Sequence, residues 1–239
     1  MENPVFINCR DRLAPLIQLI AWLEKAGQDR IYLIDNDSSY PPLLEYYETT
    51  PHRVIRLGQN VGHKALWLTD SVSDLRESTP FIFTDPDIVP IDDCPVDAIE
   101  MFADVLDRHP DIKKVGFGLK IDDIPDHYRF KREVILWESQ YWKEAVEPGL
   151  FRAPIDTTFA LYRASGEHQL DKCIRTGHPY VARHTSWYVE SDNPSDEDRY
   201  YGEHAREDIT HWTRERIPDY LQKMMEELPG AGPGDTTGT

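Results

Sequence analysis

Short apolar segments alternate with helical segments through the first 120 residues, and the connections between them are short. Five segments have the apolar content of strands: residues 5–8, "RIYLIDNDSS", "PHRVIRLGQNVG", "FIFTDPDIVP" and "KKVGFGLKI". Three segments have helical character: "LAPLIQLIAWLEKAGQ", "HKALWLTDSVSDL" and "PVDAIEMFADVLDRHP". This alternation predicts an α/β fold, a Rossmann-like and mainly parallel sheet flanked by helices on both faces.

The second half is less regular. "REVILWESQYWKEAVEPG" indicates a helix, and "PIDTTFALYRA" and "YVARHTSWYV" indicate strands, which predicts a smaller mixed subregion. The acidic residues 190–208 predict a mobile loop, and "IPDYLQKMMEEL" a last helix. We expect a single domain over residues 1–228, with halves at 1–120 and 121–228, and a disordered tail at 229–239.

The net charge of the chain is -17, which argues against binding to nucleic acid or to an anionic membrane surface. A phosphate-bearing ligand would therefore need a metal ion, a helix N-terminus or a few local cations. The three cysteines, Cys9, Cys94 and Cys173, are scattered and form no zinc-ligand spacing, which fits reduced thiols. No signal-peptide pattern and no apolar run near the ~18 residues of a membrane span is present, so we expect a cytoplasmic location.

Charged clusters follow three of the expected strands. Because the carboxyl ends of parallel strands meet at one edge of a sheet, where ligands bind, we expect these clusters to lie together. Aspartates after the second strand can accept hydrogen bonds from a base or ribose, and arginines after the first can contact a diphosphate. Solvated turns are the alternative for each cluster. The clusters are Arg10-Asp11-Arg12, Asp35-Asn36-Asp37 and Asp85-Pro86-Asp87.

Asp85 and Asp87 end the fourth apolar segment only two residues apart. Carboxylates this close repel each other unless a divalent cation neutralises them. Their hard oxygen ligands suit Mg²⁺ or Mn²⁺, which would bridge the protein to a diphosphate and stabilise it as a leaving group. An Asx-Pro turn after a strand is the alternative interpretation.

Several of these segments, in this order, resemble the GT-A glycosyltransferases, especially the bacterial family-2-like enzymes. "PVFINCRDRLAPLIQLIAWLEKAG" is similar to the family's opening strand, loop and helix, "IYLIDNDSS" to its acidic second-strand motif, "NVGHKALW" to its Asn-x-Gly segment, and "FTDPDI" to its DxD motif. The resemblance covers about the first half of the chain. It implies a GT-A fold, with a nucleotide-sugar-binding half at 1–120 and an acceptor-side half at 121–228.

The resemblance also implies site residues. Asp85 and Asp87 would hold the metal, and His184, in the second half of the chain, would complete its ligands. A histidine ligand favours Mn²⁺ over Mg²⁺. A structural role for His184 is the alternative. The implied donor is a UDP-sugar, with GDP- and dTDP-sugars open, and the acceptor is a glycan or another hydroxyl compound. The residues expected to bind the nucleotide are Asn8, Arg10, Arg12, Asp35, Asp37, Asn60, Lys64 and Asp85.

The catalytic base is less defined, because the Glu-Asp pair usual in the family has no clear counterpart here. Asp156, at the start of "PIDTTFALYR", is a candidate to deprotonate the acceptor hydroxyl. Asp122 and Asp123 are rivals, and Asp208 is a weaker one. Retention and inversion therefore both remain open.

Aromatic residues and the acidic loop complete the expectations. Trp137, Tyr141 and Trp142 can stack on a sugar, but Trp137 and Tyr141 share a helical face with Val134 and Ala145, which favours core packing. The loop at 190–208 is predicted to close over the donor when nucleotide and metal bind.

Two other functions fit parts of the sequence. Asp85-x-Asp87 also fits the opening motif of haloacid-dehalogenase-type phosphatases, with Asp122 and Asp123 as the later acidic pair, although that motif normally lies on the first strand of the core. A non-catalytic protein that binds nucleotide sugars or glycans would use the same fold. The sequence favours a metal-dependent glycosyltransferase.

Overall fold

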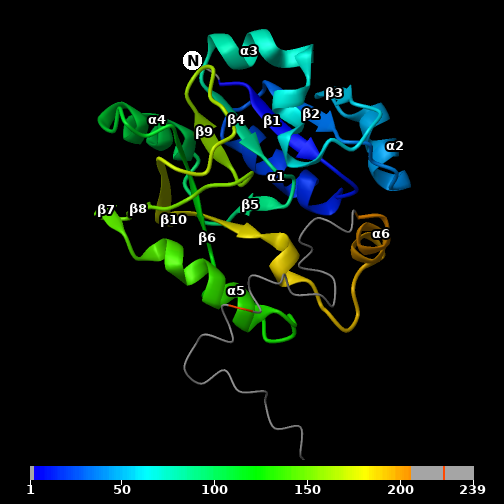
Figure 1. Cartoon of the computed structure of the whole chain (residues 1–239). Helices are drawn as coiled ribbons and strands as arrows, with labels where there is room; N and C mark the ends of the chain where they lie inside the picture. Colours follow the sequence, from blue (N-terminus) through cyan, green and yellow to red (C-terminus); the bar gives the residue numbers. More distant parts are fainter. Residues whose placement is uncertain (1–2, 206–222, 224–239) are drawn as a thin grey trace, which may run out of the picture.

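A computed structural model describes residues 3–205 and residue 223. In that part of the chain, ten strands form one sheet in the order β3-β2-β1-β4-β9-β6-β10-β8-β7, and β5 pairs with β10 (Figure 1). The strands are β1 (Val5–Cys9), β2 (Ile31–Asp35), β3 (Arg53–Arg56), β4 (Phe81–Thr84), β5 (Ile88–Pro90), β6 (Lys114–Leu119), β7 (Ala145–Glu147), β8 (Leu150–Arg152), β9 (Ala160–Tyr162) and β10 (Cys173–His184).

Helices connect and cover these strands. The α-helices are α1 (Ala14–Lys25), α2 (Pro41–Thr49), α3 (Ser73–Ser78), α4 (Ala98–Arg108), α5 (Lys131–Glu138) and α6 (Asp196–His204). Short 3₁₀ segments are η1 (Gly62–Leu68), η2 (Asp70–Val72), η3 (Ser139–Trp142) and η4 (Thr185–Tyr188).

The strand directions divide the sheet into two parts. β3, β2, β1 and β4 are parallel neighbours, as the strand–helix alternation predicts. β9 is antiparallel to both β4 and β6, and β10 is parallel to β6 but antiparallel to β5 and β8. The α/β class is therefore confirmed, with the parallel strands in the first half and the mixed strands in the second.

Side-chain alternation along the strands gives the sheet two buried faces. In β1, Val5 and Ile7 join the core that includes α1 and α4, whereas Phe6 joins the core beneath η1 and η2. Helix α1 buries the residues that its helical spacing predicts, including Leu16, Leu19 and Leu23. Because both faces are covered, the open edge at the carboxyl ends of the strands is where polar side chains can gather.

Three segments differ from the sequence-based predictions. The helix expected over residues 63–75 is a series of short turns, because Thr69 is extended and its hydroxyl accepts a hydrogen bond from the Ser71 amide. The helix expected over residues 132–149 ends at Glu138 and is followed by a β7–β8 hairpin, whose Pro148-Gly149 turn places Gly149 at a φ of 74°.

The third difference is the acidic segment that was predicted to be a mobile loop. Asp196–His204 forms helix α6, and the hydroxyl of Ser195 caps it by accepting a hydrogen bond from the Asp198 amide. Three acidic residues in its first turn stabilise the helix, because they lie at the positive end of its dipole. The predicted last helix, apart from residue 223, and the predicted tail lie outside the described residues, and so does Asp208.

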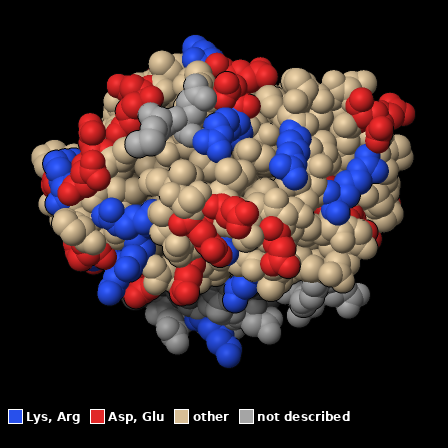
Figure 2. Space-filling model, turned by 90° about the horizontal axis from the view of Figure 1, so that it is seen from above, with Lys and Arg blue, Asp and Glu red and all other residues tan. Residues whose placement is uncertain are grey.

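The surface carries both signs of charge. Figure 2 shows lysine and arginine side chains interspersed with aspartate and glutamate over the face seen from above. Across residues 3–205, no helix combines the length and the apolar character that a membrane crossing requires.

A glycine lets β9 lie close to β6, so we predict that Gly116→Ala is strongly destabilising. A Cβ at Gly116 would lie 2.3 Å from the Phe159 carbonyl oxygen and 2.8 Å from the Ala160 Cβ, so β9 would have to move. The expected loss is about 1–3 kcal/mol in the free energy of unfolding, measured in urea. Gly202→Ala, in α6 with open space around it, is the control and should gain up to about 1 kcal/mol. Equal stability of the two variants would contradict the packing described here.

Candidate functional site

A cleft of about 530 Å³ opens at the carboxyl ends of β1 and β4. Residues that follow these strands form one side, and residues of α5, β10 and the segment before β9 form the other. Its lining includes Asn8, Arg10, Arg12, Asn36, Asn60, Asp85, Asp87, Trp137, Glu138, Tyr141, Asp156, Thr157, Arg175, His184, Trp187 and Tyr201. Members of all three strand-end clusters thus lie in one lining: Arg10 and Arg12, Asn36, and Asp85 and Asp87.

Asp85 is held at the end of β4 by the segment before β9. Its amide donates to the Thr157 carbonyl oxygen at 3.0 Å, and its carboxylate accepts hydrogen bonds from the Thr157 hydroxyl and, at 3.4 Å, from the Asn8 side-chain amide. Burial, together with the neighbouring charge of Asp87, raises the pKa of Asp85 to about 7. The neutral acid is therefore favoured at Asp85 unless a cation lies beside its carboxyl group.

Asp87 has a cationic partner, His184. Strand β5 pairs with the end of β10 and places Ile88 opposite His184, which brings the imidazole next to Asp87. The Asp87 carboxylate lies 3.1 Å from Nε2 of His184 and accepts a 2.7 Å hydrogen bond from the Ser186 hydroxyl. Although burial opposes it, the charges of His184 and Arg12 hold the pKa of Asp87 well below its usual range. Burial likewise opposes ionisation of His184, but Asp87 raises the pKa of the imidazole.

The expected metal ligands Asp85, Asp87 and His184 all line the cleft. Among the described residues, no group of three or more His, Cys, Asp or Glu side chains is arranged around a common metal position. His184 is hydrogen-bonded to Asp87 instead. The donor set nevertheless fits a divalent cation. Two carboxylates lie two residues apart, and Nδ1 of His184 is buried without a hydrogen-bond partner in the described part of the chain.

Arg12, in the loop that follows β1, is a buried cation of the same cleft lining. Only 5% of its surface is exposed, and its guanidinium pairs with Asp198 and lies 4.1 Å from the centre of the Tyr201 ring, both on α6. Its Nε and Nη2 atoms are buried and make no hydrogen bond within the described residues. Two strong donors are thus available for an anion.

Helix α6 also caps the N-terminus of α1. The Glu197 carboxylate accepts hydrogen bonds from the amides of Leu13 (2.8 Å) and Ala14 (3.0 Å), where α1 has no capping side chain of its own. The Tyr200 hydroxyl donates to the Ser39 carbonyl oxygen at 3.0 Å, beside α2 (Figure 1). The predicted lid segment is therefore a docked helix in this structure, and its carboxylates meet the groups that were expected to meet a diphosphate.

Arg10 and two asparagines shape the loops beside the cleft. Arg10 donates to the Asn36 carbonyl oxygen at 3.0 Å and contacts Asp37. The Asn36 side chain bridges to the next loop, accepting from the Val61 amide at 2.8 Å and donating to the Gly62 carbonyl oxygen at 2.9 Å. Asn60 accepts a 3.0 Å hydrogen bond from the Gly62 amide. These contacts fix the loop that follows β3.

Three residues expected at the nucleotide lie outside the cleft lining. Asp35 is buried, and its carboxylate accepts hydrogen bonds from the Ser38 amide (3.0 Å) and the Tyr47 hydroxyl (3.3 Å), so it organises the β2–α2 turn. Asp37 is exposed at a φ of 66° beside Arg10. Lys64 is exposed on η1. The sequence correctly places Asp35 and Asp37 at the end of β2 and Lys64 after β3, but it does not reveal that none of the three lines the cleft.

Of the candidate bases, Asp156 lines the cleft. Its carboxylate is mostly exposed and lies 3.2 Å from Nε2 of His168, whose ring packs against His63 and Trp67. Burial lowers the pKa of His168, so the neutral imidazole is favoured as the partner of Asp156. His168 had no signal in the sequence, because the contact spans twelve residues of irregular chain.

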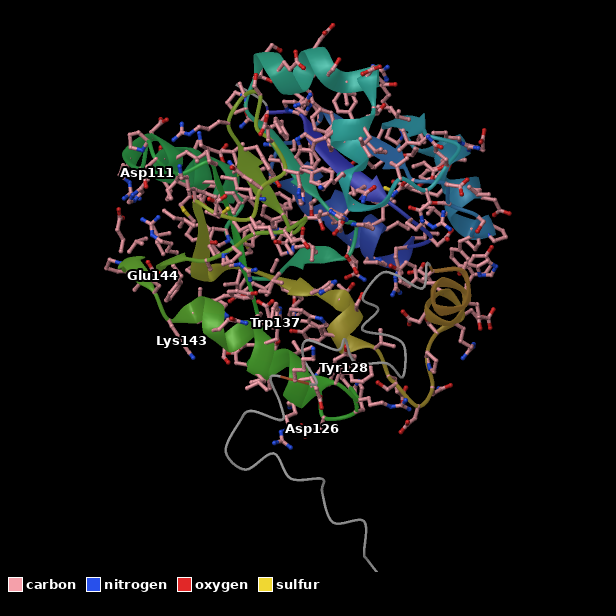
Figure 3. The ribbon with its side chains drawn as sticks, viewed as in Figure 1. Asp111, Asp126, Tyr128, Trp137, Lys143 and Glu144 are labelled. Carbon is pink, nitrogen blue, oxygen red and sulfur yellow. The ribbon has the colours of Figure 1, made fainter. Side chains whose placement is uncertain are left out.

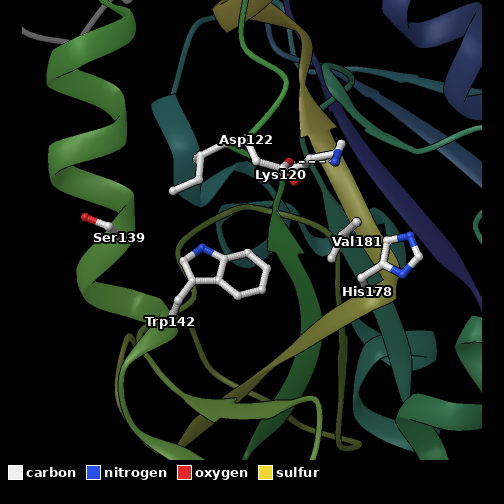
Figure 4. A pocket seen from close by; sticks show the side chains of 7 residues that line it. Lys120, Asp122, Ser139, Trp142, His178 and Val181 are labelled. Atoms are coloured by element: carbon white, nitrogen blue, oxygen red, sulfur yellow. Dashed lines mark hydrogen bonds and ion pairs between the residues drawn. The ribbon is translucent and has the colours of Figure 1, made fainter.

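Asp122 and Asp123 lie away from this cleft. Asp123 forms an ion pair with Arg183 at 2.7 Å and accepts a hydrogen bond from the Tyr188 hydroxyl. Asp122 pairs with Lys120 and lines a second pocket of about 290 Å³, into which the Trp142 indole projects (Figure 4). Both carboxylates are thus bound to neighbouring cations outside the cleft.

Trp137 and Tyr141 were expected to pack in the core and instead line the cleft half-buried. The prediction was wrong because α5 ends at Glu138, so Ala145 is not on the same helical face but in the exposed part of β7. Trp137 lies on the side of α5 that faces the sheet, whereas Lys143 points outward (Figure 3). Both residues named by the stacking alternative are thus half-buried members of the cleft lining.

The sequence did not single out three polar residues of the cleft lining, Thr157, Glu138 and Arg175, or Ser186 beside Asp87. Thr157 and Ser186 are hydrogen-bonded to Asp85 and Asp87, and Glu138 and Arg175 form a buried ion pair in the wall. Their positions depend on β9 and β10, whose pairing with the first half of the chain leaves no mark in local spacing. Only the run of polar residues around His184 offered a signal for Ser186.

No profile of a known protein family matches the chain, and no curated protein matches it by sequence. Solved structures resemble it distantly. A mannosyltransferase from Pyrobaculum calidifontis, in complex with GDP-Man and Mn²⁺, is 13% identical over 68% of this chain and 44% of its own, with a TM-score of 0.43. The chain therefore spans less than half of that enzyme.

Two further structures are similarly remote. An apo UDP-glucose pyrophosphorylase is 11% identical over 85% of this chain and 99% of its own, with a TM-score of 0.48. A protein named HddC from Yersinia pseudotuberculosis, complexed with GMP-PN, is 18% identical over 52% of this chain and 61% of its own, with a TM-score of 0.34.

We predict that Glu197→Ala lowers stability by about 1 kcal/mol, because it leaves the Leu13 and Ala14 amides at the N-terminus of α1 without their acceptor. Glu203→Ala is the matched control, because Glu203 is exposed on the same helix. Urea unfolding of both variants measures the difference. If the two variants are equally stable, the contact between α6 and α1 contributes nothing in solution.

Proposed function

We propose that this chain is a metal-dependent glycosyltransferase that moves a sugar from a nucleoside-diphosphate donor, a UDP-sugar in the first instance, to a hydroxyl acceptor. The observation that supports this proposal is the pair of carboxylates, Asp85 and Asp87, in a cleft that Arg12 and His184 also line. A carboxylate pair with a cation in the same cleft is the electrostatic arrangement that a metal–diphosphate ligand requires.

Binding of the donor diphosphate rests on Arg12. Its free Nε and Nη2 atoms present a planar fork that matches phosphate oxygens. The amides of Leu13 and Ala14 lie beside it at the positive end of α1, and they become available if Glu197 releases them. Arg10, Asn8 and Asn60 extend this polar side of the cleft toward the nucleoside.

Asp85, Asp87 and His184 would hold the divalent cation, with manganese favoured by the imidazole. When bound, the cation would offset the repulsion between the two carboxylates and stabilise the diphosphate as it leaves. Thr157 and Ser186 orient the carboxylates through their hydroxyls, in the way that outer hydrogen bonds fix metal ligands.

On the acceptor side, Asp156 would take the proton of the attacking hydroxyl. Its carboxylate lines the same cleft and is open to solvent, so an acceptor can reach it. His168 would hold it in place through the 3.2 Å contact. The sequence-based alternatives, a phosphatase with Asp85 as nucleophile and a non-catalytic binder, are outcomes of the experiment below.

Thermal unfolding with UDP, GDP or dTDP, with and without Mn²⁺, tests the donor site. One nucleotide together with the metal should raise the melting temperature by roughly 5–10 °C at ~100 times its dissociation constant, since this adds about 2.7 kcal/mol. Asp85→Ala and Asp87→Ala should each abolish the shift. Asp122→Ala, outside the cleft, should keep it.

Products then separate the activities. With a nucleotide-sugar donor we expect release of the nucleoside diphosphate, dependent on metal and on both aspartates. Release of inorganic phosphate from simple phosphomonoesters would instead favour the phosphatase. Formation of a nucleoside triphosphate on addition of pyrophosphate would indicate nucleotidyl transfer, and binding with no product under any acceptor would indicate a non-catalytic protein.

A further inference from the structure

A buried ion pair in the cleft wall has no part in the function proposed above. Arg175 on β10 and Glu138 at the end of α5 are 6% and 4% exposed, and Nη1 of Arg175 lies 2.8 Å from Oε2 of Glu138. Both residues nevertheless line the cleft. A buried ion pair is weak evidence for a stabilising role, because the cost of desolvating both charges offsets much of their attraction.

Each member of the pair keeps one unused hydrogen-bonding atom. Arg175 donates through Nε to the Pro154 carbonyl oxygen at 2.7 Å and through Nη1 to Glu138. Within the described residues, its Nη2 atom and the Oε1 atom of Glu138 make no hydrogen bond. The wall therefore offers a charged donor beside a charged acceptor.

Two aromatic rings lie next to this pair. The Arg175 guanidinium is 4.4 Å from the centre of the Tyr141 ring, and the rings of Tyr141 and Trp137 are 5.8 Å apart and nearly perpendicular. Both rings are half-buried and line the cleft, and Trp137 lies on the side of α5 that faces the sheet (Figure 3). Partly exposed aromatic faces are surfaces on which an amphipathic ring can rest.

The combination matches a pyranose with two neighbouring hydroxyl groups. One hydroxyl can donate to Oε1 of Glu138 while its neighbour accepts from Nη2 of Arg175, and the C–H face of the sugar can cover an aromatic ring. A phosphate would be repelled by Glu138, and an apolar ligand would leave Oε1 of Glu138 and Nη2 of Arg175 without hydrogen bonds. The wall also belongs to the same cleft as Asp87 and His184, so a sugar here would be near the proposed diphosphate site.

We propose that Trp137, Glu138, Tyr141 and Arg175 form a sugar subsite that selects a pyranose through two neighbouring hydroxyl groups. The inference rests on the proposed function for its link to transfer, since the pyranose belongs either to the donor or to the acceptor. The opposing explanation is that the ion pair only ties α5 to β10.

A paired substitution separates these explanations. Glu138→Gln alone would leave the buried Arg175 charge without its counter-charge and can unfold the chain. Glu138→Gln/Arg175→Met removes both charges at similar volume, so the fold should persist. Glu147→Gln/Arg108→Met makes the same changes at an ion pair outside the cleft and is the control.

The readout is binding, by saturation-transfer NMR of methyl glucopyranosides, galactopyranosides and mannopyranosides, and by calorimetry of UDP and GDP against their sugar conjugates. We expect the wild type and the control to bind at least one glycoside or to prefer one conjugate over its nucleotide. The Glu138→Gln/Arg175→Met variant should lose this at least about tenfold while its affinity for the free nucleotide is kept. Loss for glycosides alone assigns the subsite to the acceptor, and loss for the conjugate assigns it to the donor.

A folded Glu138→Gln/Arg175→Met variant that binds glycosides and conjugates like the wild type would overturn the inference, as would a wild type that recognises no sugar in either form. Failure of every nucleotide to bind would count against the proposed function only. The glycoside comparison between wild type and variant would still decide the subsite.

Discussion

The repulsion between Asp85 and Asp87 is the constraint around which the cleft is built. Burial makes that repulsion larger than it would be in water. It also raises the pKa of Asp85, so the neighbouring groups do not fully offset the cost of ionising this carboxyl group. His184 and the Ser186 hydroxyl stabilise the Asp87 carboxylate, whereas within residues 3–205 the Asp85 carboxylate receives hydrogen bonds only from the neutral donors Thr157 and Asn8. A cation between the carboxylates would remove the imbalance, which is why the chemistry of the site points to a metal.

The sheet explains how these groups meet. β4 delivers Asp85 to the open edge, and β5 turns back to pair with β10, which brings His184 to Asp87 from 97 residues away. The first-half strands were predictable, because their apolar runs and the spacing of Leu16, Leu19 and Leu23 on α1 are local signals. The short β9 and the long β10 were not, since their partners are chosen by tertiary packing.

The site was predictable to the same extent. The strand-end rule placed Arg12, Asp85 and Asp87 in one cleft, although it could not tell that Asp35 turns inward to serve its own loop. The sequence did not predict the Glu138–Arg175 ion pair or helix α6, and the reason is different. Glu138 sits in an amphipathic segment that resembles an ordinary core helix, and an acidic stretch of a chain with net charge -17 resembles a solvated loop.

In the function proposed above, Asp85 and Asp87 hold a divalent cation against a nucleoside diphosphate. Crystals grown with Mn²⁺ and the nucleotide that stabilises the chain, with diffraction recorded at the manganese absorption edge, would locate that cation. We expect one anomalous peak within about 2.2 Å of an oxygen of each carboxylate, with the diphosphate on its other side toward Arg12. A nucleotide bound in the cleft with no peak between the aspartates, or a peak at another group, would contradict it.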